Sequence, residues 1–355
     1  MSKHTTTIWQ MHVTEKLLKG SKDTYMTRSV SRCAFICAII LSLTGALNGQ
    51  PERKQKKPGK NDQKEPVTQT LPVLPDPPPA VAAETARLVF HVSPLSAKGL
   101  LSQQVRDALR ALERDNRGAQ MVKLRAFVAG TGDMRRVQQI VSEVFTEKKQ
   151  PLPALTTIEV GALPLEGAQV VIESVSADKR MVNPSGLAFL PVQPIAGLKA
   201  GGEILKVTCF LTAFDVLEQA RTQIREAFPA AAADFVQLTR FGGQPMTECD
   251  AVAHVGAAPP SGAVVFSGPK IVFTGLQMAF SDQDADIRLA LDRLKRAVEP
   301  LGGRMDGSLV SAYTLTREGA GAVGRVLGAG ASPLIIEELP SLDAAVGLEA
   351  VAAGN

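Results

Sequence analysis

Few residues of this 355-residue sequence have types and spacing that suggest chemistry. Cys209 and Cys249 each lie in an apolar run typical of a strand. In an oxidising compartment the two thiols can pair, and two free buried cysteines fit the sequence equally well. The chain has no CxxC or HExxH motif and no His/Cys/Asp cluster at metal-ligand spacing, so we expect neither a metal nor a cofactor. The segment 153–176, PALTTIEVGALPLEGAQVVIESVS, reads as two strands around a Pro/Gly turn, and it raises the question of a catalytic segment.

Three segments that share one order of elements must position these residues. Residues 84–177 read as strand, helix, strand, helix and a closing pair of strands, and residues 258–355 repeat that order. The segment between them, 178–257, follows the same order without its first helix, because only a few residues separate Gly197 from Ile204. The sequence therefore predicts three α+β units of similar size.

The N-terminus reads as a targeting signal. Basic residues precede the apolar run 33–47, and small residues follow it, as in a secretory signal peptide; the run is shorter than the roughly 20 residues of a membrane span. We expect residues 1–49 to be a signal peptide with an N-terminal extension, and the mature chain to be exported to the periplasm or outside the cell. An uncleaved signal would instead anchor the protein in the membrane. The sequence leaves Met1 and Met26 as alternative starts.

A basic and then Pro-rich stretch follows over residues 50–83, and its composition predicts a solvated linker. Residues 1–49 carry the whole formal charge of +4, so the mature chain is near neutral. We therefore expect no nucleic-acid partner and no membrane insertion of the mature chain.

One family resemblance spans about residues 85–353. MVKLRAFVAGTGDMRRVQQIVSEVF, followed by the segment 153–176, resembles the RidA family, also called YjgF or endoribonuclease L-PSP. The closing pattern is clearest in the first segment, the first-helix pattern in the third, and the middle segment matches weakly. The resemblance implies a chorismate-mutase-like α+β unit, a mixed sheet with two helices on one face, three of which form a trimer with ligand clefts between neighbours. Three divergent copies in one chain then imply an intramolecular pseudo-trimer that is a monomer in solution.

The resemblance also implies where the family's reactive groups would lie. Family deaminases hydrolyse enamines or imines such as 2-aminoacrylate; an arginine grips the substrate carboxylate, and a glutamate lies near the attacking water. The arginine position falls on Leu155 in the first copy, Ala233 in the second, and Ala331 or Ser332 in the third. The acidic position falls on Glu173, Asp250 and Glu349. All three acids are present and all three arginines are absent, although Arg180 or Arg240 could substitute from elsewhere.

We therefore expect a protein without the family's deaminase reaction, which acts as a small-molecule-binding or protein-interaction module. A small-molecule ligand would lie in the clefts near Leu155, Ala233 and Ser332. The retained acids fit a structural role at the seams between copies. The alternative is a diverged deaminase or other hydrolase that uses Glu173, Asp250 or Glu349 as a general base on an uncharged or cationic substrate. RNA cleavage is a weaker alternative, because the mature chain is near neutral.

Overall fold

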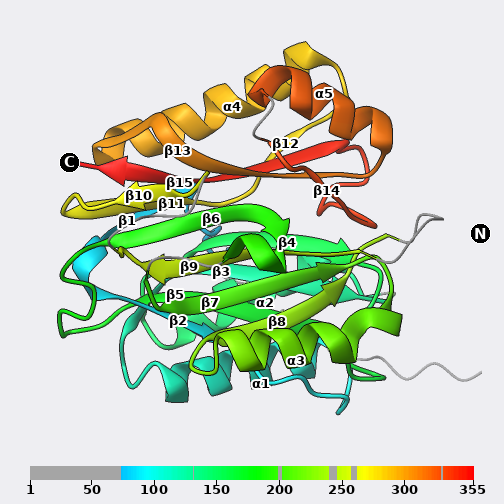
Figure 1. The fold of residues 1–355 in the computed structure, drawn as a ribbon, viewed down its shortest axis with the longest axis horizontal. Coiled ribbons are helices and arrows are strands. Elements are labelled where there is room, and N and C mark those ends of the chain that lie inside the picture. The colour runs from blue at the N-terminus through cyan, green and yellow to red at the C-terminus, as the bar shows by residue number, and fades with distance from the viewer. Residues whose placement is uncertain (1–72, 131, 199–201, 240–245, 257–261, 329–330) are drawn as a thin grey trace, which may run out of the picture. The chain divides into compact units, whose positions relative to one another are not determined.

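The computed structural model describes residues 73–355 except 131, 199–201, 240–245, 257–261 and 329–330. The described residues form three sheets and five α-helices, a mixed α+β architecture (Figure 1). The signal peptide predicted over 1–49 and most of the linker lie outside the described residues. Single-turn 3-10 helices add short connections at Thr85–Arg87, Ile195–Leu198, Phe214–Val216 and Glu299–Leu301.

The first sheet has the strand order β2-β5-β3-β4, and two helices cover one of its faces. β3 and β4 are parallel, and α2 connects them. Both helices carry their apolar residues at helical spacing, so one side of each packs on the sheet. The elements are β2 (Leu88–Val92), α1 (Leu101–Asp115), β3 (Gln120–Ala129), α2 (Met134–Glu147), β4 (Ala154–Val160) and β5 (Val170–Ala177).

The second sheet has the order β10-β6-β9-β7-β8, and a single described helix, α3, packs on it. Between β6 and β7 the described residues form only the 3-10 turn Ile195–Leu198, where the first sheet has α1. The elements are β6 (Leu187–Pro194), β7 (Ile204–Leu211), α3 (Leu217–Ala227), β8 (Ala232–Gln237), β9 (Thr247–His254) and β10 (Val264–Phe266).

The third sheet has the order β1-β11-β15-β13-β14, with the short β12 also paired to β15. α4 and α5 cover one face of it. The elements are β1 (Ala80–Glu84), β11 (Lys270–Thr274), β12 (Gln277–Ala279), α4 (Asp284–Val298), β13 (Gly303–Thr314), α5 (Arg317–Leu327), β14 (Leu334–Ile335) and β15 (Val346–Gly354).

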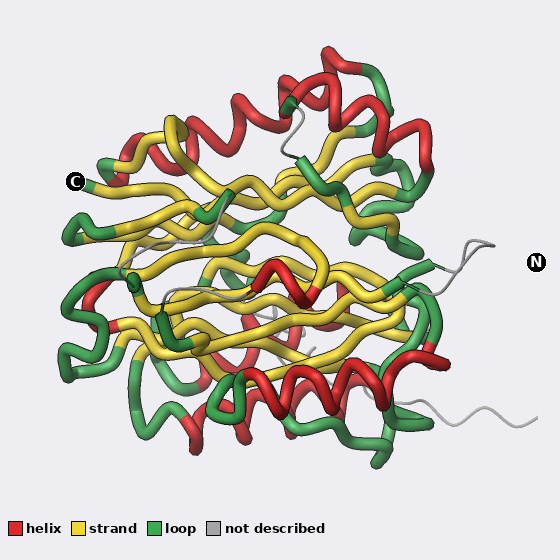
Figure 2. Tube along the Cα trace, viewed as in Figure 1, coloured by secondary structure: helices red, strands yellow, loops and turns green. Residues whose placement is uncertain are grey.

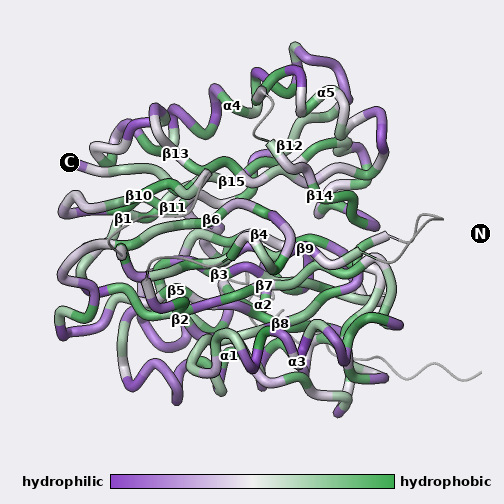
Figure 3. Tube along the Cα trace, in the orientation of Figure 1, coloured by the Kyte–Doolittle hydropathy of each residue, from purple (hydrophilic) through white to green (hydrophobic). Residues whose placement is uncertain are grey.

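The faces of the three sheets that carry no helix pack against one another (Figure 2). One shared core contains Phe127, Phe210 and Tyr313, one from each sheet. A second contains Phe90 and Phe189, with Phe273 from the third sheet. The helices face outward from these cores, and Figure 3 shows hydrophilic positions alternating with hydrophobic ones along them.

Two strands lie in a different sheet from the one their sequence position suggests. The linker predicted over 50–83 ends earlier, because Ala80–Glu84 forms β1 and pairs with β11 of the third sheet. β10 falls within the predicted third unit, 258–355, yet it pairs with β6 of the second sheet. Both strands supply backbone partners to an edge that would otherwise be open, which sequence periodicity alone does not reveal.

Candidate functional site

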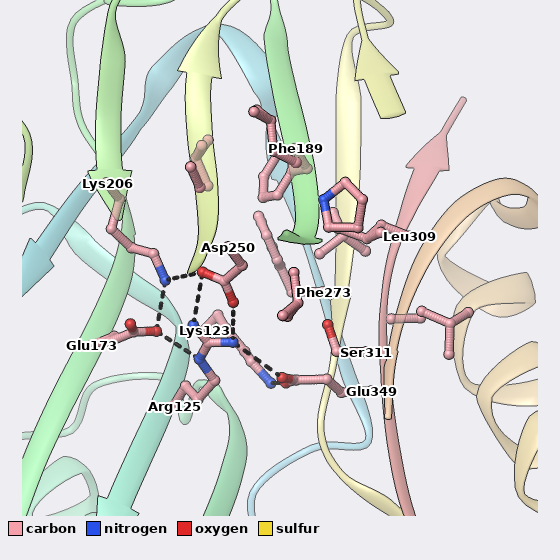
Figure 4. Close-up of a pocket in the computed structure, with 18 of the residues that line it drawn as sticks. Lys123, Arg125, Glu173, Phe189, Lys206, Asp250, Phe273, Leu309, Ser311 and Glu349 are labelled. Atoms are coloured by element: carbon pink, nitrogen blue, oxygen red, sulfur yellow. Dashed lines mark hydrogen bonds and ion pairs between the residues drawn. The ribbon is translucent and has the colours of Figure 1, made fainter. Parts of the chain in front are cut away.

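The three candidate acids hold the same place in their three sheets. In the ladders, Glu173 lies opposite Arg125, Asp250 opposite Thr208, and Glu349 opposite Ser311. Each acid is on a central strand, β5, β9 or β15, and its side chain points away from the helices toward the other sheets (Figure 4). The structure therefore brings together three carboxylates that are widely separated in the sequence.

Arg125 on β3 is at the centre of this group. Its guanidinium donates from Nε to Glu173 at 2.7 Å, from Nη1 to Asp250 at 2.8 Å, and from Nη2 to the hydroxyl of Thr208 at 2.9 Å. It also lies 5.1 Å from the ring centre of Phe127. Burial alone would lower the pKa of Arg125, but the carboxylates of Asp250 and Glu173 outweigh it and hold the pKa well above its ordinary value.

Two lysines complete the positive side of the cluster. Lys206 Nζ lies 2.8 Å from Glu173 and 3.7 Å from Asp250. Lys123 Nζ donates to Glu349, and at 2.7 Å to the hydroxyl of Thr156 and to the carbonyl of Thr274. Burial lowers the pKa of Lys123 although Glu349 opposes the shift. We call Lys123, Arg125, Lys206, Glu173, Asp250 and Glu349 the central cluster.

The cations keep two of the acids ionised. Burial would raise the pKa of Glu173, but Arg125 and Lys206 outweigh it and lower that pKa well below its ordinary value. In the same way Lys123 and Arg125 lower the pKa of Glu349 to about 2. A general base must be free to accept a proton near neutral pH. Cations bound in this way favour the ionised form of both carboxylates, and each carboxylate is part of a buried ion-pair network.

Asp234 adds a fourth carboxyl beside the cluster. It is 5% exposed and lies opposite Thr208 in the parallel ladder of β7 and β8. Burial, with the negative charge of Glu173, raises the pKa of Asp234 well above its ordinary value. With both carboxyls ionised, Asp234 would have no hydrogen-bond donor, whereas a proton on Asp234 allows it to donate to Glu173.

A cavity of about 110 Å³ opens beside the central cluster and is partly open to solvent. The six cluster residues line its polar side, and Tyr313 donates to Glu349 there. Phe189, Phe273 and Leu309 line its apolar side (Figure 4). Phe90 lines it as well. The cavity thus presents a charged end and a hydrophobic end, as sites for small amphiphilic molecules do.

Leu155 lies in a separate cleft. This cleft, of about 210 Å³, is lined by Leu155, Thr157, Gln138 and Pro340, with residues 77–79 and 275–278, and none of these carries a charge. The carbonyl of Leu155 accepts a hydrogen bond from the amide of Leu276. The structure therefore does not bring Leu155 and Glu173 into one site, and the cleft at Leu155 has neither the guanidinium nor the carboxylate of the family pattern.

The other positions carried over from the family pattern are dispersed. Ala233 packs against the core beneath α3, Ala331 packs against the core of the third sheet, and Ser332 lines the cavity of the central cluster. Arg180 is exposed and bonds to Asp178, so it lies away from these sites. Arg240 is outside the described residues.

Sequence reasoning missed the cations of the cluster. Lys123 and Arg125 alternate along the otherwise apolar run MVKLRAFVAG, which places both on the same face of a strand. Two basic side chains on the buried face of a strand need anionic partners, and this was the available signal.

Cys209 and Cys249 form a disulfide that joins β7 to β9. The two residues are direct partners in the antiparallel ladder, with Cα atoms 4.1 Å apart. They adjoin Thr208 and Asp250, so the disulfide holds together the two strands that carry the second sheet's part of the cluster.

No group of three or more His, Cys, Asp or Glu side chains suited to a metal occurs in the described part of the chain. Within the same residues, every helix is too short or too polar to cross a bilayer.

No protein-family model and no curated protein matches the chain. Among solved structures, the chain is similar to a chorismatase at 13% identity, over 78% of this chain and 77% of that one, with a TM-score of 0.39. It is also similar to Escherichia coli TdcF, solved with bound serine, at 14% identity over 28% of this chain and 86% of that one, with a TM-score of 0.25. The YjgF gene product of E. coli is similar at 19% identity, over 30% of this chain and 94% of that one, with a TM-score of 0.25. One of these neighbours is thus a chorismatase, and the YjgF gene product carries a name of the family that the sequence resembles.

Proposed function

We propose that this chain is an exported RidA-like protein without the family's deaminase reaction, which acts as a non-catalytic module for binding a small molecule or a partner protein. The observation that carries the proposal is the neutralisation of the retained acids: Glu173 and Glu349 each bind two buried cationic groups in the central cluster. The uncharged lining of the cleft at Leu155 supports it further, because a substrate carboxylate there would have no cationic partner.

The finer architecture in this proposal is an intramolecular pseudo-trimer of three diverged copies. The equivalent ladder positions support it. A valine follows each acid by two residues, and a phenylalanine of the neighbouring strand is its ladder partner. The pairs are Val175 with Phe90, Val252 with Phe189, and Val351 with Phe273. Such a repeated register is expected of three copies of one unit. A monomer in solution, with a mass no greater than the 37.6 kDa of the full chain, is the expected result of sedimentation analysis; a homotrimer would overturn intramolecular closure.

The disulfide supports the proposed export. Disulfides persist in oxidising compartments and are uncommon in the cytosol. N-terminal sequencing of the protein recovered from outside the cytoplasm should place the cleavage near the end of the predicted signal peptide at residue 49. Recovery of an uncleaved chain in the membrane fraction would support the anchored alternative instead.

An imine-hydrolysis assay tests the loss of the deaminase reaction. The purified protein should release no ammonia from 2-iminopropionate above the buffer rate, with a family deaminase as the positive control. Robust hydrolysis would overturn the proposal.

The exposure of Asp250 favours the hydrolase alternative. The side chain of Asp250 is 15% exposed, more than the 5% of Glu173 or the 8% of Glu349, and it lines the cavity. If Asp250 is a general base for a neutral or cationic substrate, Asp250→Asn should abolish an activity while the variant still folds, as circular dichroism at the assay temperature would show.

A further inference from the structure

The central cluster lacks one cation that its own pattern calls for. The valine two residues after each acid also has a ladder partner on its other side. That partner is Lys123 in the first sheet, Lys206 in the second and Leu309 in the third. Lys123 reaches Glu349 of the third sheet, and Lys206 reaches Glu173 of the first. The same relation would join a third lysine at Leu309 to Asp250 of the second sheet. The residue at this position is leucine, which is uncharged and cannot pair with Asp250.

The cavity lies at this same place. Asp250 borders it from the second sheet, while Leu309, Ser311 and Ser332 border it from the third. Figure 4 shows the Ser311 hydroxyl, Leu309 and Asp250 around one space. Ser332 is two residues before Leu334. By ladder register, its position in the third sheet is equivalent to that of Thr156 in the first sheet and Asp234 in the second. Thr156 is one of the groups that bind the ammonium of Lys123.

The net charge of the buried groups also favours a further cation at this place. Four carboxyl groups, from Glu173, Asp250, Glu349 and Asp234, face three cationic side chains. With every group ionised, this set is one positive charge short of neutrality. Either a proton on Asp234 or a bound cation would supply that charge.

We propose that the cavity binds an organic ammonium ion, a primary amine with an apolar body, whose ammonium group takes the place of the missing third lysine. The ammonium donates to the carboxylate of Asp250 and to the hydroxyls of Ser311 and Ser332. The apolar body packs against Leu309, Phe189 and Phe273. A ligand carboxylate is disfavoured at this position, because all three cations already bind carboxylates of the protein. This inference rests on the proposed binding function and on the threefold equivalence of the sheets.

Calorimetric titration of the purified protein with three probes of similar shape tests the proposal. The probes are phenethylammonium, neutral 2-phenylethanol and anionic phenylacetate. We expect phenethylammonium to bind in the millimolar range or tighter and to be preferred over the other two by at least about tenfold. Equal or tighter binding of the anion, or no binding of the ammonium in the millimolar range, overturns the proposal.

Two variants locate the site. Asp250→Asn should weaken phenethylammonium binding at least about tenfold, since it removes the carboxylate and keeps the shape. Leu309→Lys should abolish the binding, because the chain then carries its own ammonium, and it should raise Tm above that of wild type. Leu309→Met is the matched control: it has a long uncharged side chain, so it should leave Tm unraised and retain the preference for the ammonium over the anion.

These results are distinguishable from failure of the proposed function. Hydrolysis of 2-iminopropionate would overturn the non-catalytic assignment without affecting amine binding. Loss of the ammonium preference with no imine hydrolysis would overturn the amine site alone. If Leu309→Lys fails to fold, the wild-type probe series and Asp250→Asn still decide the question. Unchanged binding in Asp250→Asn contradicts the proposed position of the ammonium.

Discussion

Arg125 Nη1 lies 2.8 Å from Asp250 Oδ2, although the two residues are 125 positions apart and belong to different sheets. The same guanidinium binds Glu173 of its own sheet. Arg125 therefore links carboxylates from two sheets, and Glu349 of the third sheet lies 3.9 Å from the same Nη1. The helix-free faces thus pack around a buried positive charge that these carboxylates neutralise.

Replacement of Arg125 should be strongly destabilising. Arg125→Met leaves Lys206 as the cationic partner of the buried carboxylates of Glu173 and Asp250. Loss of one partner of a buried ion pair costs about 3–5 kcal/mol. Urea unfolding measures the loss. Arg180→Met is the control: Arg180 is an exposed arginine paired with Asp178, and its replacement should leave the free energy of unfolding nearly unchanged. Equal effects of the two changes would contradict the central role of Arg125.

Glu349 should contribute to the loss of stability in acid. Its pKa is lowered to about 2 in the folded protein from an ordinary value of 4.5, because Lys123 and Arg125 outweigh its burial. The folded state therefore favours the ionised form. That contribution is complete above pH 4.5 and is lost as the pH falls toward 2. The stability difference between wild type and Glu349→Gln should shrink over that range in urea unfolding. A difference independent of pH would count against this assignment.

Glu159 should act in the opposite direction. Partial burial, with Glu338 and Glu337 nearby, raises its pKa from 4.5 to about 7. The folded state then favours the protonated form, so this stabilising contribution is present below pH 4.5 and is lost as the pH rises through 7. Glu159→Gln should be more stable than wild type at pH 8, by about 1 kcal/mol or less because the group retains contact with solvent.

The Glu159 effect has its own internal control. The amide of Glu159 on β4 donates to the carbonyl of Glu338, which follows β14, so the two residues are neighbours. In a Glu338→Gln background the pH-dependent gain from Glu159→Gln should be smaller, because one repelling charge is gone. A gain that is unchanged in that background would mean that Glu338 does not raise the pKa of Glu159.

The disulfide should stabilise the fold substantially. It closes a loop with a sequence separation of 40, for which the chain-entropy relation gives about 4 kcal/mol. Cys209→Ala/Cys249→Ala should lower the unfolding free energy by about that amount, and reductant should lower it in wild type but not in the variant. Full labelling of both thiols by an alkylating reagent in the non-reduced, unfolded protein would show that the pair does not form.

The sequence was informative where the signal is local. The helical spacing of Val105, Leu109 and Leu112 predicts the helix that the structure has at Leu101–Asp115. Only a few residues separate Gly197 from Ile204, and the described residues between β6 and β7 form the 3-10 turn Ile195–Leu198. Local periodicity is sufficient for such elements, because the burial of one face is encoded every three or four residues.

The site was only half predictable. The motif resemblance identified Glu173, Asp250 and Glu349, which the structure brings together, and it assigned them to the same region as Leu155, which lies in another cleft. The cations Lys123, Arg125 and Lys206 match no motif. Their role depends on which carboxylates face them across the sheets.

The sequence by itself determined the order of strands and helices, the position of each acid within its closing strand, and the absence of arginine at Leu155, Ala233 and Ala331. These are properties of short segments, whose periodicity and residue types are legible along the chain. Tertiary structure alone decided that Cys209 meets Cys249, that β1 and β10 pair in sheets other than their expected ones, and that Leu309 and Asp250 line the same cavity. Those relationships depend on strand register and on the packing of three sheets, which bring together residues that no local pattern connects.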